Sequence, residues 1–320
     1  MSTKCTFHSR LASAMSQFVA FKRMQGYDYT SQAVALQGFD RLLSVSDCSD
    51  GVLQSDTFER YVAATAELAP GTRAVRLAVV RQFSRYLHAH RPESAVVPLG
   101  MLPRHSRQIR FFQITENQVS ELMNAATRLR PKNSIRPHSI RFLIGILYST
   151  GLRISEALKL DLRDVDLKRS TLLVRMGKFG KDRLAPVSPS TREALNTWLE
   201  LRSHYAETGA LTPLFLGAWN RRLTYGQASY GFRRLCLRCG LLGKPSPRLH
   251  DLRHNYACRR ITLWREAGQD IEALLPILAH AMGHANIFNT QLYIHIDAQT
   301  FLQASEKFNS HVTQQMENPI

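Results

Sequence analysis

The sequence has no long apolar run, few cysteines and a shortage of acidic residues. The longest apolar stretch near a predicted helix is Phe142 to Tyr148, far short of the roughly 20 residues that a membrane-spanning helix needs. Polar residues interrupt the apolar ones throughout residues 1–21, so we expect no signal peptide, no membrane association and a cytoplasmic protein. The odd number of cysteines, five, argues against a framework of disulfides.

The shortage of acidic residues makes the chain strongly basic. Lys and Arg number 42 against 25 Asp and Glu, which gives a formal net charge of +17. The excess is not a detachable tail, because basic residues outnumber acidic ones 14 to 8 up to residue 110 and 28 to 17 after it. With 44% hydrophobic residues the chain can still bury a core. These values exclude a disordered chain and predict a folded protein with a polyanionic partner such as nucleic acid.

The length of 320 residues suggests about two domains. Apolar residues recur at spacings of three and four within residues 8–89, which predicts a small helical bundle. The segment that follows combines three prolines with three arginines: Pro92, Pro98, Pro103, Arg104, Arg107 and Arg110. We therefore place a helical N-terminal domain at residues 1–95, a basic linker at 96–112 and a second domain at 113–320.

The second domain carries both helical and β signals. Capping-box pairs predict three helix starts, at Thr115 with Gln118, Ser190 with Glu193, and Thr224 with Gln227. Two β-prone runs, LLVRM from Leu172 and RLAPVS from Arg183, flank the turn GKFGKD and predict a hairpin. The expected fold is mainly α, with a helical N-terminal bundle and a mostly helical C-terminal domain that contains a small antiparallel β-sheet.

Four segments of this domain could carry chemistry: GLRISEAL at 151–158, GKFGKDR at 177–183, HDLRH at 250–254 and MGHANIFNTQLY at 282–293. Each has an ordinary structural explanation by itself, such as a helical ion pair between Arg153 and Glu156. From these segments one can select two arginines, two histidines, one lysine of the predicted hairpin and one tyrosine: Arg153, Arg253, His250, His284, Lys178 and Tyr293. Transfer of a DNA phosphodiester to a protein hydroxyl needs this set, because guanidinium groups bind phosphate oxygens, imidazoles move protons and tyrosine attacks.

The order and spacing of these segments resemble the tyrosine recombinase (phage integrase) family. The resemblance implies two domains that clamp duplex DNA, the first being the helical core-binding domain, and cleavage without metal, ATP or another cofactor. It assigns Arg153 and Arg253 to the scissile phosphate and makes Tyr293 the nucleophile of a 3′-phosphotyrosyl link. No Gly-rich phosphate loop is expected, because rejoining uses the energy stored in that link, and the sequence has none.

The resemblance also implies supporting roles. Lys178 would be the general acid for the departing 5′ oxygen, with Lys181 of the same turn as the alternative. His250 would handle the tyrosine proton, His284 would hydrogen-bond the phosphate, and Glu156 would brace the site. The 31 positions from Arg253 to His284 exceed the usual family spacing, as in some transposon-borne members.

The implied partners are double-stranded DNA and further copies of the chain in a homo-tetramer on paired sites, with a second recombinase or a DNA-bending protein as an optional addition. Residues 298–308 are expected to form a terminal helix that packs on a neighbouring copy, with packing in cis as the alternative. Phosphate contacts are expected from seven arginines in particular: Arg104, Arg107, Arg110, Arg221, Arg222, Arg233 and Arg234. Integration, excision, resolution and transposition stay open as outcomes.

Two other functions stay open, a relaxing enzyme like type IB topoisomerases and a non-catalytic DNA-binding architectural protein. Several residues are given no catalytic role. We expect surface or capping contacts for His254 and His295, a place in the helix core for Tyr256, and either packing or DNA contact for Trp219. Zinc binding by His280 and His284 is disfavoured because Gly283 interrupts the helix between them. Cys236 and Cys239 are expected to be small buried thiols.

Overall fold

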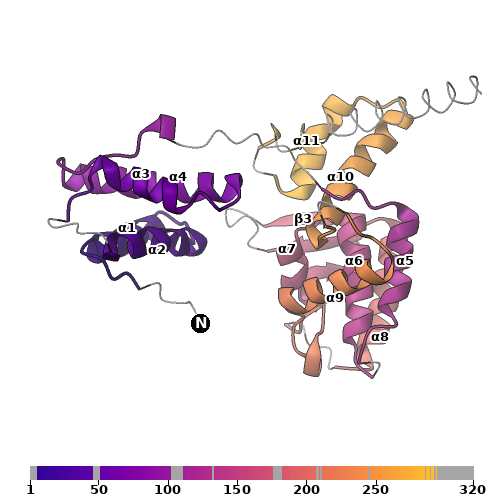
Figure 1. Cartoon of the computed structure of the whole chain (residues 1–320). Coiled ribbons are helices and arrows are strands. Elements are labelled where there is room, and N and C mark those ends of the chain that lie inside the picture. The colour runs from indigo at the N-terminus through magenta and orange to yellow at the C-terminus, as the bar shows by residue number, and fades with distance from the viewer. Residues whose placement is uncertain are drawn as a thin grey trace, which may run out of the picture. The chain divides into compact units, whose positions relative to one another are not determined.

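A computed structural model describes residues 6–45, 51–101, 111–131, 133–175, 182–206, 209, 211–243, 246–284, 286–288, 290, 291 and 293. The chain divides into two compact units, residues 1–108 and 109–320 (Figure 1). The boundary falls inside the segment predicted to be the linker. The residues just before and after the undescribed stretch 102–110 pack onto the units, since Val97 is buried in the first core and Ile114 in the second. No described helix is both long enough and apolar enough to cross a membrane.

The first unit is a helical bundle, as predicted. Its elements are α1 (Ala12–Met24), α2 (Thr30–Val45), α3 (Ser55–Ala64), α4 (Pro70–His90) and the 3-10 turn η1 (Leu99–Met101). Aromatic side chains from different helices meet in its core, where Phe18 contacts Phe83 and Phe39 contacts Tyr61. The buried carboxylate of Asp40 accepts hydrogen bonds from two backbone N–H groups of the segment before α1, which fixes that segment on the bundle.

The second unit is mostly helical with a small sheet. Its helices are α5 (Glu116–Ala126), α6 (Arg136–Thr150), α7 (Ile154–Lys159), α8 (Pro189–Ser203), α9 (Tyr225–Arg238), α10 (Leu249–Glu266) and α11 (Ile271–Met282), with 3-10 turns η2 (Leu162–Asp164) and η4 (Ala218–Asn220). The strands are β1 (Val165–Asp166), β2 (Thr171–Val174) and β3 (Arg183–Pro186), antiparallel in the order β1-β2-β3. The predicted hairpin is therefore confirmed, in the register Leu173 opposite Leu184.

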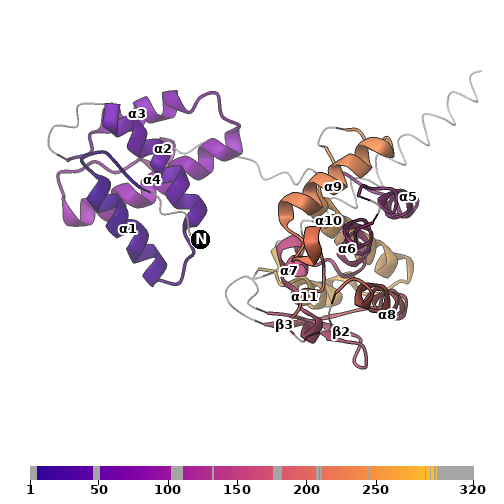
Figure 2. The ribbon, with the colours of Figure 1, turned by 90° about the horizontal axis from the view of Figure 1, so that it is seen from below.

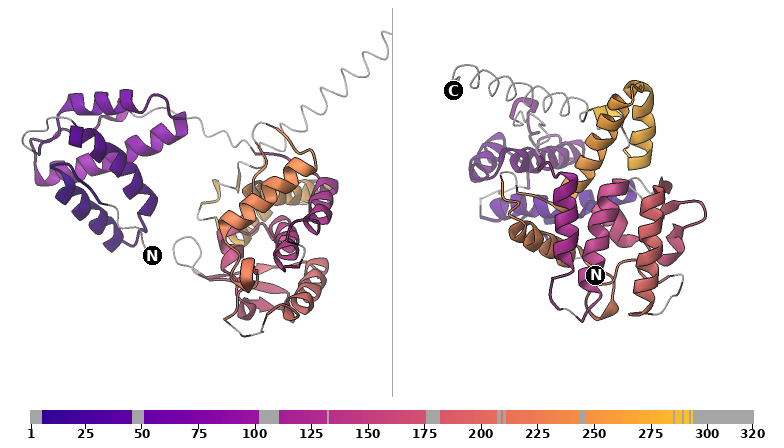
Figure 3. Two further views of the ribbon diagram at one scale, coloured as in Figure 1. Left: turned by 60° about the horizontal axis from the view of Figure 1, so that its bottom comes forward. Right: turned by 90° about the vertical axis from the view of Figure 1, so that its right-hand side faces the viewer.

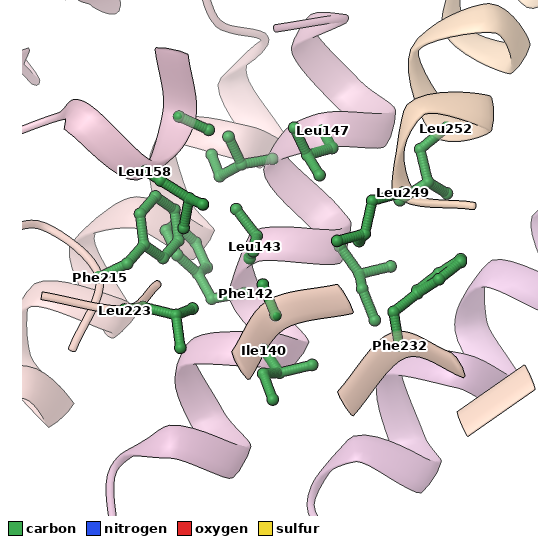
Figure 4. Close-up of a cluster of buried hydrophobic side chains, with 14 of the residues drawn as sticks. Ile140, Phe142, Leu143, Leu147, Leu158, Phe215, Leu223, Phe232, Leu249 and Leu252 are labelled. Carbon is green, nitrogen blue, oxygen red and sulfur yellow. The ribbon is translucent and has the colours of Figure 1, made fainter. Parts of the chain in front are cut away.

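Helix α6 lies at the centre of this unit and packs against α5, α8, α9 and α10 (Figures 1 and 3). It is apolar on nearly every side, which is typical of a helix enclosed by others. Figure 4 shows its side chains Ile140, Leu143 and Leu147 among residues of α7, α9 and α10. At its end Gly151 adopts φ +64, the left-handed conformation that terminates a helix, as the sequence predicts.

Two of the three helix starts predicted from capping boxes are confirmed. The capping boxes of Thr115 with Gln118 and of Thr224 with Gln227 are both formed. The prediction of a box at Ser190 was wrong, because α8 begins two residues earlier. Ser188 caps that helix by accepting a hydrogen bond from the Thr191 N–H, and a proline occupies the first helical position, where its missing N–H costs nothing.

The prediction of two buried thiols is confirmed for Cys236 on α9 but not for Cys239, the residue that follows the helix. Cys236 and Cys239 are free, the first buried and the second half-buried. Burial raises the pKa of the Cys236 thiol to about 12, so that it packs as a small neutral side chain. Tyr256 likewise packs in the core beside α11, as expected.

Candidate active site

Arg153 stands at the start of α7, directly after the turn that ends α6. Its Nη1 donates to Glu156 Oε1 at 2.6 Å, and its Nη2 donates to the carbonyl of Gly283 at 2.7 Å. Glu156 Oε2 also accepts from the Arg153 backbone N–H at 2.9 Å, which satisfies a free donor at the start of the helix. One carboxylate thus fixes both the local backbone and the guanidinium group.

Arg183, at the start of β3, completes this ion pair and was not identified from the sequence. Its Nη1 and Nη2 donate to the two oxygens of Glu156 at 3.1 and 2.8 Å, and its Nε donates to the carbonyl of Ala281 at 3.1 Å. The side chains of Arg183 and Glu156 are each only 7% exposed. A signal was available, because strand alternation places Arg183 on the same face as the buried Ala185, where a charge needs a partner.

Arg253, on α10, is the most buried arginine of the site, at 2% exposure. Its Nη1 donates to the carbonyl of Gly151 at 2.6 Å and its Nη2 donates to the carbonyl of Met282 at 2.8 Å. Burial, followed by the neighbouring positive charge of Arg153, lowers the pKa of Arg253 to about 10. The group stays charged at neutral pH, and its position is fixed from two sides.

The three arginines converge on the C-terminal end of α11, which lies beside β3 and α10 (Figure 2). Three consecutive carbonyls each accept from a different guanidinium: Ala281 from Arg183, Met282 from Arg253 and Gly283 from Arg153. Carbonyls at a helix C-terminus lack partners within the helix and carry the negative end of its dipole, so they attract cations. The end of α11 therefore aligns three arginines that come from three separate parts of the chain.

Tyr293 and His284 lie just beyond this helix end. Tyr293 is 2% exposed and packs in the small core between α10 and α11, and burial raises its pKa to about 12. The His284 ring lies parallel to the Tyr293 ring, with centroids 6.3 Å apart. His284 Nδ1 is hydrogen-bonded to Thr290 Oγ1 at 2.7 Å, which fixes the orientation of its ring. The structure thus brings together Arg153, Arg253, His284 and Tyr293.

The imidazole that contacts the tyrosine hydroxyl belongs to His254. Its Nδ1 lies 2.8 Å from Tyr293 Oη, so the expectation of a surface or capping role for His254 was wrong. His250, four residues earlier on α10, is exposed and packs edge-on against the His254 ring, with centroids 4.7 Å apart. Although the residue is exposed at the surface, partial loss of hydration of its ring and the positive charge of Arg253 lower the pKa of His250. Lys178, Lys181 and His295 lie outside the described residues.

Comparison with known proteins identifies the family of the chain. The model of the phage integrase family matches residues 113–300. The integrase/recombinase y4rB of Sinorhizobium fredii is 31% identical over 293 residues, which cover 89% of this chain and 93% of that protein. The chain belongs to the phage integrase family. Tyrosine recombinase XerC of Alcanivorax borkumensis is 33% identical over 187 residues, which cover 58% of this chain and 56% of XerC.

The fold also matches that of a solved recombinase. The XerH site-specific recombinase, in a post-cleavage complex with its palindromic difH substrate, aligns with a TM-score of 0.67 and 20% identity. The alignment covers 88% of this chain and 80% of XerH. As a tyrosine recombinase of the phage integrase family, the chain is a DNA strand-transferring enzyme.

The arginines predicted to contact DNA fall into two groups. Arg221, Arg233 and Arg234 are exposed, and the Arg234 guanidinium lies over the ring of Tyr230 on α9. Arg222 instead donates to the carbonyls of Leu158 and Leu160 and pairs with Asp161, so its guanidinium holds a loop. Arg104, Arg107 and Arg110 lie outside the described residues, as does the terminal segment 298–308. These DNA contacts stay predictions.

Trp219 and His280 lie outside the arginine cluster. Trp219 is 90% exposed and has φ +50, so it takes no part in the core. His280 lies on α11, and Gly283 ends that helix in the left-handed conformation before His284. Within the part of the chain that the structure describes, no three His, Cys, Asp or Glu side chains are grouped so that they could hold a metal ion.

The ion pairs of Glu156 predict a pH dependence of stability. Although burial opposes ionisation, the hydrogen bonds from Arg183 and Arg153 hold the pKa of Glu156 at about 2, against 4.5 as its ordinary value. The lowered pKa contributes about 3 kcal/mol, which is fully present above pH 4.5 and is lost as the pH falls through 2. We expect Glu156→Gln to have a lower free energy of unfolding than wild type at pH 7, as measured by urea denaturation. This difference in free energy should vanish as the pH falls from 4.5 to 2. Glu193→Gln, at an exposed carboxylate of α8, should show no such convergence.

Gly283 provides a test of the crowding around Arg183. A Cβ at Gly283 would lie 2.8 Å from the Arg183 guanidinium carbon, at φ +68, whereas a Cβ at Gly268, at φ +64, would meet nothing within 4 Å. The left-handed backbone lowers the free energy of unfolding of both alanine variants by about 1 kcal/mol. In Gly283→Ala, overpacking lowers it by about 1–3 kcal/mol more. We expect Gly283→Ala to lower the melting temperature more than Gly268→Ala and to slow DNA cleavage. Equal melting temperatures would mean that Arg183 moves aside freely.

Proposed function

We propose that this recombinase cuts and rejoins DNA strands at specific sites, with Tyr293 attacking a phosphodiester that Arg153 and Arg253 hold. One observation carries the proposal. Two guanidinium groups, those of Arg153 and Arg183, share the single carboxylate of Glu156. A third, that of Arg253, is held close to them by two backbone carbonyls, next to the buried hydroxyl of Tyr293. Excess positive charge in a dehydrated place favours an anionic ligand, and the fork of donors on arginine fits the oxygens of a phosphodiester.

The proposed cleavage joins Tyr293 Oη to the phosphorus and releases the 5′ oxygen, which leaves a 3′-phosphotyrosyl link. Arg153 and Arg253 stabilise the charge on the pentacoordinate phosphorus, which is usually the largest catalytic contribution. His284 donates a hydrogen bond to the phosphate, and Lys178 protonates the departing oxygen. Because the link conserves the energy of the broken bond, a free 5′-OH reverses the attack, and the cycle needs neither a metal ion nor ATP.

The proposed substrate is double-stranded DNA, bound by a homo-tetramer that pairs two sites. The solved XerH relative is bound to a palindromic DNA substrate, which supports binding of duplex DNA by a similar fold. The net charge of +17 supports contact with many phosphates, so we expect affinity to fall steeply with added salt. The products would be integrated, excised, resolved or transposed DNA segments.

The proposal is tested with duplexes made from the DNA on either side of this protein's own gene, each carrying a nick near the candidate site. The nick lets a short fragment diffuse away after cleavage, so the covalent complex accumulates in the presence of EDTA. We expect a protein–DNA band that survives denaturation, with the nucleotide mapped to Tyr293 by mass spectrometry. Duplexes that are bound but never cleaved would instead favour the architectural protein, and relaxation of plasmid without strand exchange would favour the topoisomerase.

A further inference from the structure

Gly38 lies in the middle of α2, a position at which glycine is unfavourable for a helix. Helix α2 packs against α3 and α4 in the first unit (Figure 2). Outside the backbone of α2 itself, the three heavy atoms nearest to the place of a Gly38 Cβ are all polar: Tyr61 Oη at 3.5 Å, Arg76 Nη1 at 3.7 Å and Arg41 Nη2 at 4.0 Å. The absent side chain thus leaves a place on α2 that three polar atoms surround.

Two of these atoms belong to guanidinium groups that have no carboxylate between them. Arg41 is an exposed residue of α2, and Arg76 is a half-buried residue of α4. Neither forms an ion pair within the described part of the chain. Like charges close to each other repel, so an anion between them is stabilised. Helix α4 adds to the positive charge, since it contributes Arg73, Arg81 and Arg85 and no acidic residue.

The third polar atom, Tyr61 Oη, comes from the core of the unit. Tyr61 is 1% exposed, and its ring contacts the Phe39 ring, with centroids 5.0 Å apart. Its hydroxyl has no partner of normal hydrogen-bond geometry among the described residues, although the guanidinium of Arg76 lies near it. Burial raises the pKa of Tyr61 against the opposing charges of Arg76 and Arg41, so the oxygen keeps its proton. A buried O–H without an acceptor is unfavourable, and an anionic oxygen at Gly38 supplies the acceptor.

We propose that Arg41 and Arg76 bind one backbone phosphate of duplex DNA, with a phosphate oxygen at Gly38. The inference rests on the proposed action on double-stranded DNA and adds a phosphate that is not cut. An oxygen at the place of the absent Cβ lies 3.5–4.0 Å from the three polar atoms. Small rotations of the two arginine side chains bring their N–H groups within about 2.7–3.2 Å of it, the normal hydrogen-bond distance. The contact would fix the register of the first unit on DNA without reading its sequence.

The surrounding charge favours a polyanion over a free phosphate ion. Basic residues outnumber acidic ones 14 to 8 up to residue 110. Arg73 lies three residues before Arg76 on the same face of α4, so a second phosphate of the same strand finds a guanidinium group nearby. Contact with several phosphates releases several counterions, which a single phosphate ion cannot do. Inorganic phosphate, exchanged for chloride at constant ionic strength, should therefore compete poorly with the duplex.

The arginines are tested in the full chain by titration with DNA from about 50 to 200 mM salt. The probes are the duplexes from beside this protein's own gene and a duplex of unrelated sequence. Arg41→Ala and Arg76→Ala should each bind both probes about tenfold more weakly, because a phosphate contact is blind to sequence. In the double variant the slope of log affinity against log salt should be smaller by about 0.9, the value for one phosphate. Ethylation of single phosphates should reveal one whose charge matters to wild type and not to the double variant.

Gly38→Ala separates this role from a structural one. Alanine is the better helix former, so the first unit should melt at a temperature about 4–8 °C higher. The added methyl group takes the place of the phosphate oxygen, so the affinity for both duplexes should fall by about tenfold, as in the arginine variants. Higher stability with unchanged affinity would show that no phosphate comes close to Gly38.

Arg60→Ala is the matched control, since it removes the same charge from α3, where Arg60 is paired with Asp56. Its affinity and salt slope should stay close to those of wild type. Wild-type affinity in both Arg41→Ala and Arg76→Ala overturns the inference, and so does an equal loss in Arg60→Ala, which would reduce the effect to net charge. Strong competition by inorganic phosphate would assign the site to a free anion instead. Cleavage by wild type would uphold strand transfer in each of these cases, whereas wild type that binds no duplex overturns both proposals.

Discussion

Tyr293→Phe should bind DNA as wild type does and form no covalent complex with it. The substitution removes the attacking oxygen and little else, because the ring keeps its place in the core between α10 and α11. Loss of a nucleophile costs enzymes on the order of 10⁶-fold, so the band in the nicked-duplex assay should fall below detection. Binding should persist, since it rests on the distributed basic charge of the chain. Gel mobility shifts at a fixed salt concentration measure DNA binding, and a denaturing gel measures the covalent complex.

Tyr256→Phe is the matched control. Tyr256 also lies near the arginines, with its ring against Gly151, but it is partly buried against the core between α10 and α11. The variant should cleave at the wild-type rate. A covalent band that persists in Tyr293→Phe and disappears in Tyr256→Phe would show that Tyr256 is the nucleophile.

The fold was predictable where a local signal decides the structure. Thr115 and Thr224 start helices because a side-chain oxygen accepts a nearby N–H, and Gly151 ends one because its φ is positive. The hairpin follows from β-prone runs on either side of a turn. Strand β1 was missed because two residues are too few for a periodic pattern, and only pairing with β2 defines it.

The site was predictable from the sequence only as a set of residues in family order. Nothing local in HDLRH distinguishes His250 from His254 as the neighbour of a tyrosine some 40 residues later. Which imidazole faces Tyr293 depends on how α10 packs against the segment after α11, a contact between distant parts of the chain. For Arg183, the alternation of β3 indicates a side chain that faces inward, but its partners could not be predicted because Glu156 and Ala281 lie 27 and 98 residues away.

Arg253 should be the arginine whose loss damages folding and catalysis together. Arg253→Ala leaves the carbonyls of Gly151 and Met282 without a donor in the interior, which costs about 2–4 kcal/mol in the free energy of unfolding. It also removes a fixed charge from the proposed phosphate site, and loss of one such donor costs about 10² to 10³-fold in rate. Urea denaturation and single-turnover cleavage of the nicked duplexes measure the two losses.

Arg153→Ala separates the two effects. The Arg153 side chain is 22% exposed, and Glu156 keeps both hydrogen bonds from Arg183 when Arg153 is removed. Its loss should therefore cost only about 1 kcal/mol of stability, with a fall in cleavage similar to that of Arg253→Ala.

The contrast between the two arginines follows from burial. Arg253 is enclosed, so water cannot replace it at the two carbonyls, whereas water can reach the place of Arg153. Arg253→Lys sharpens the test because lysine keeps the charge but cannot span both carbonyls. It should stay slow in cleavage and recover only part of the lost stability. Equal losses of stability in Arg253→Ala and Arg153→Ala would show that the carbonyls at the end of α11 find other donors, and the three arginines would then be aligned by phosphate rather than by the helix.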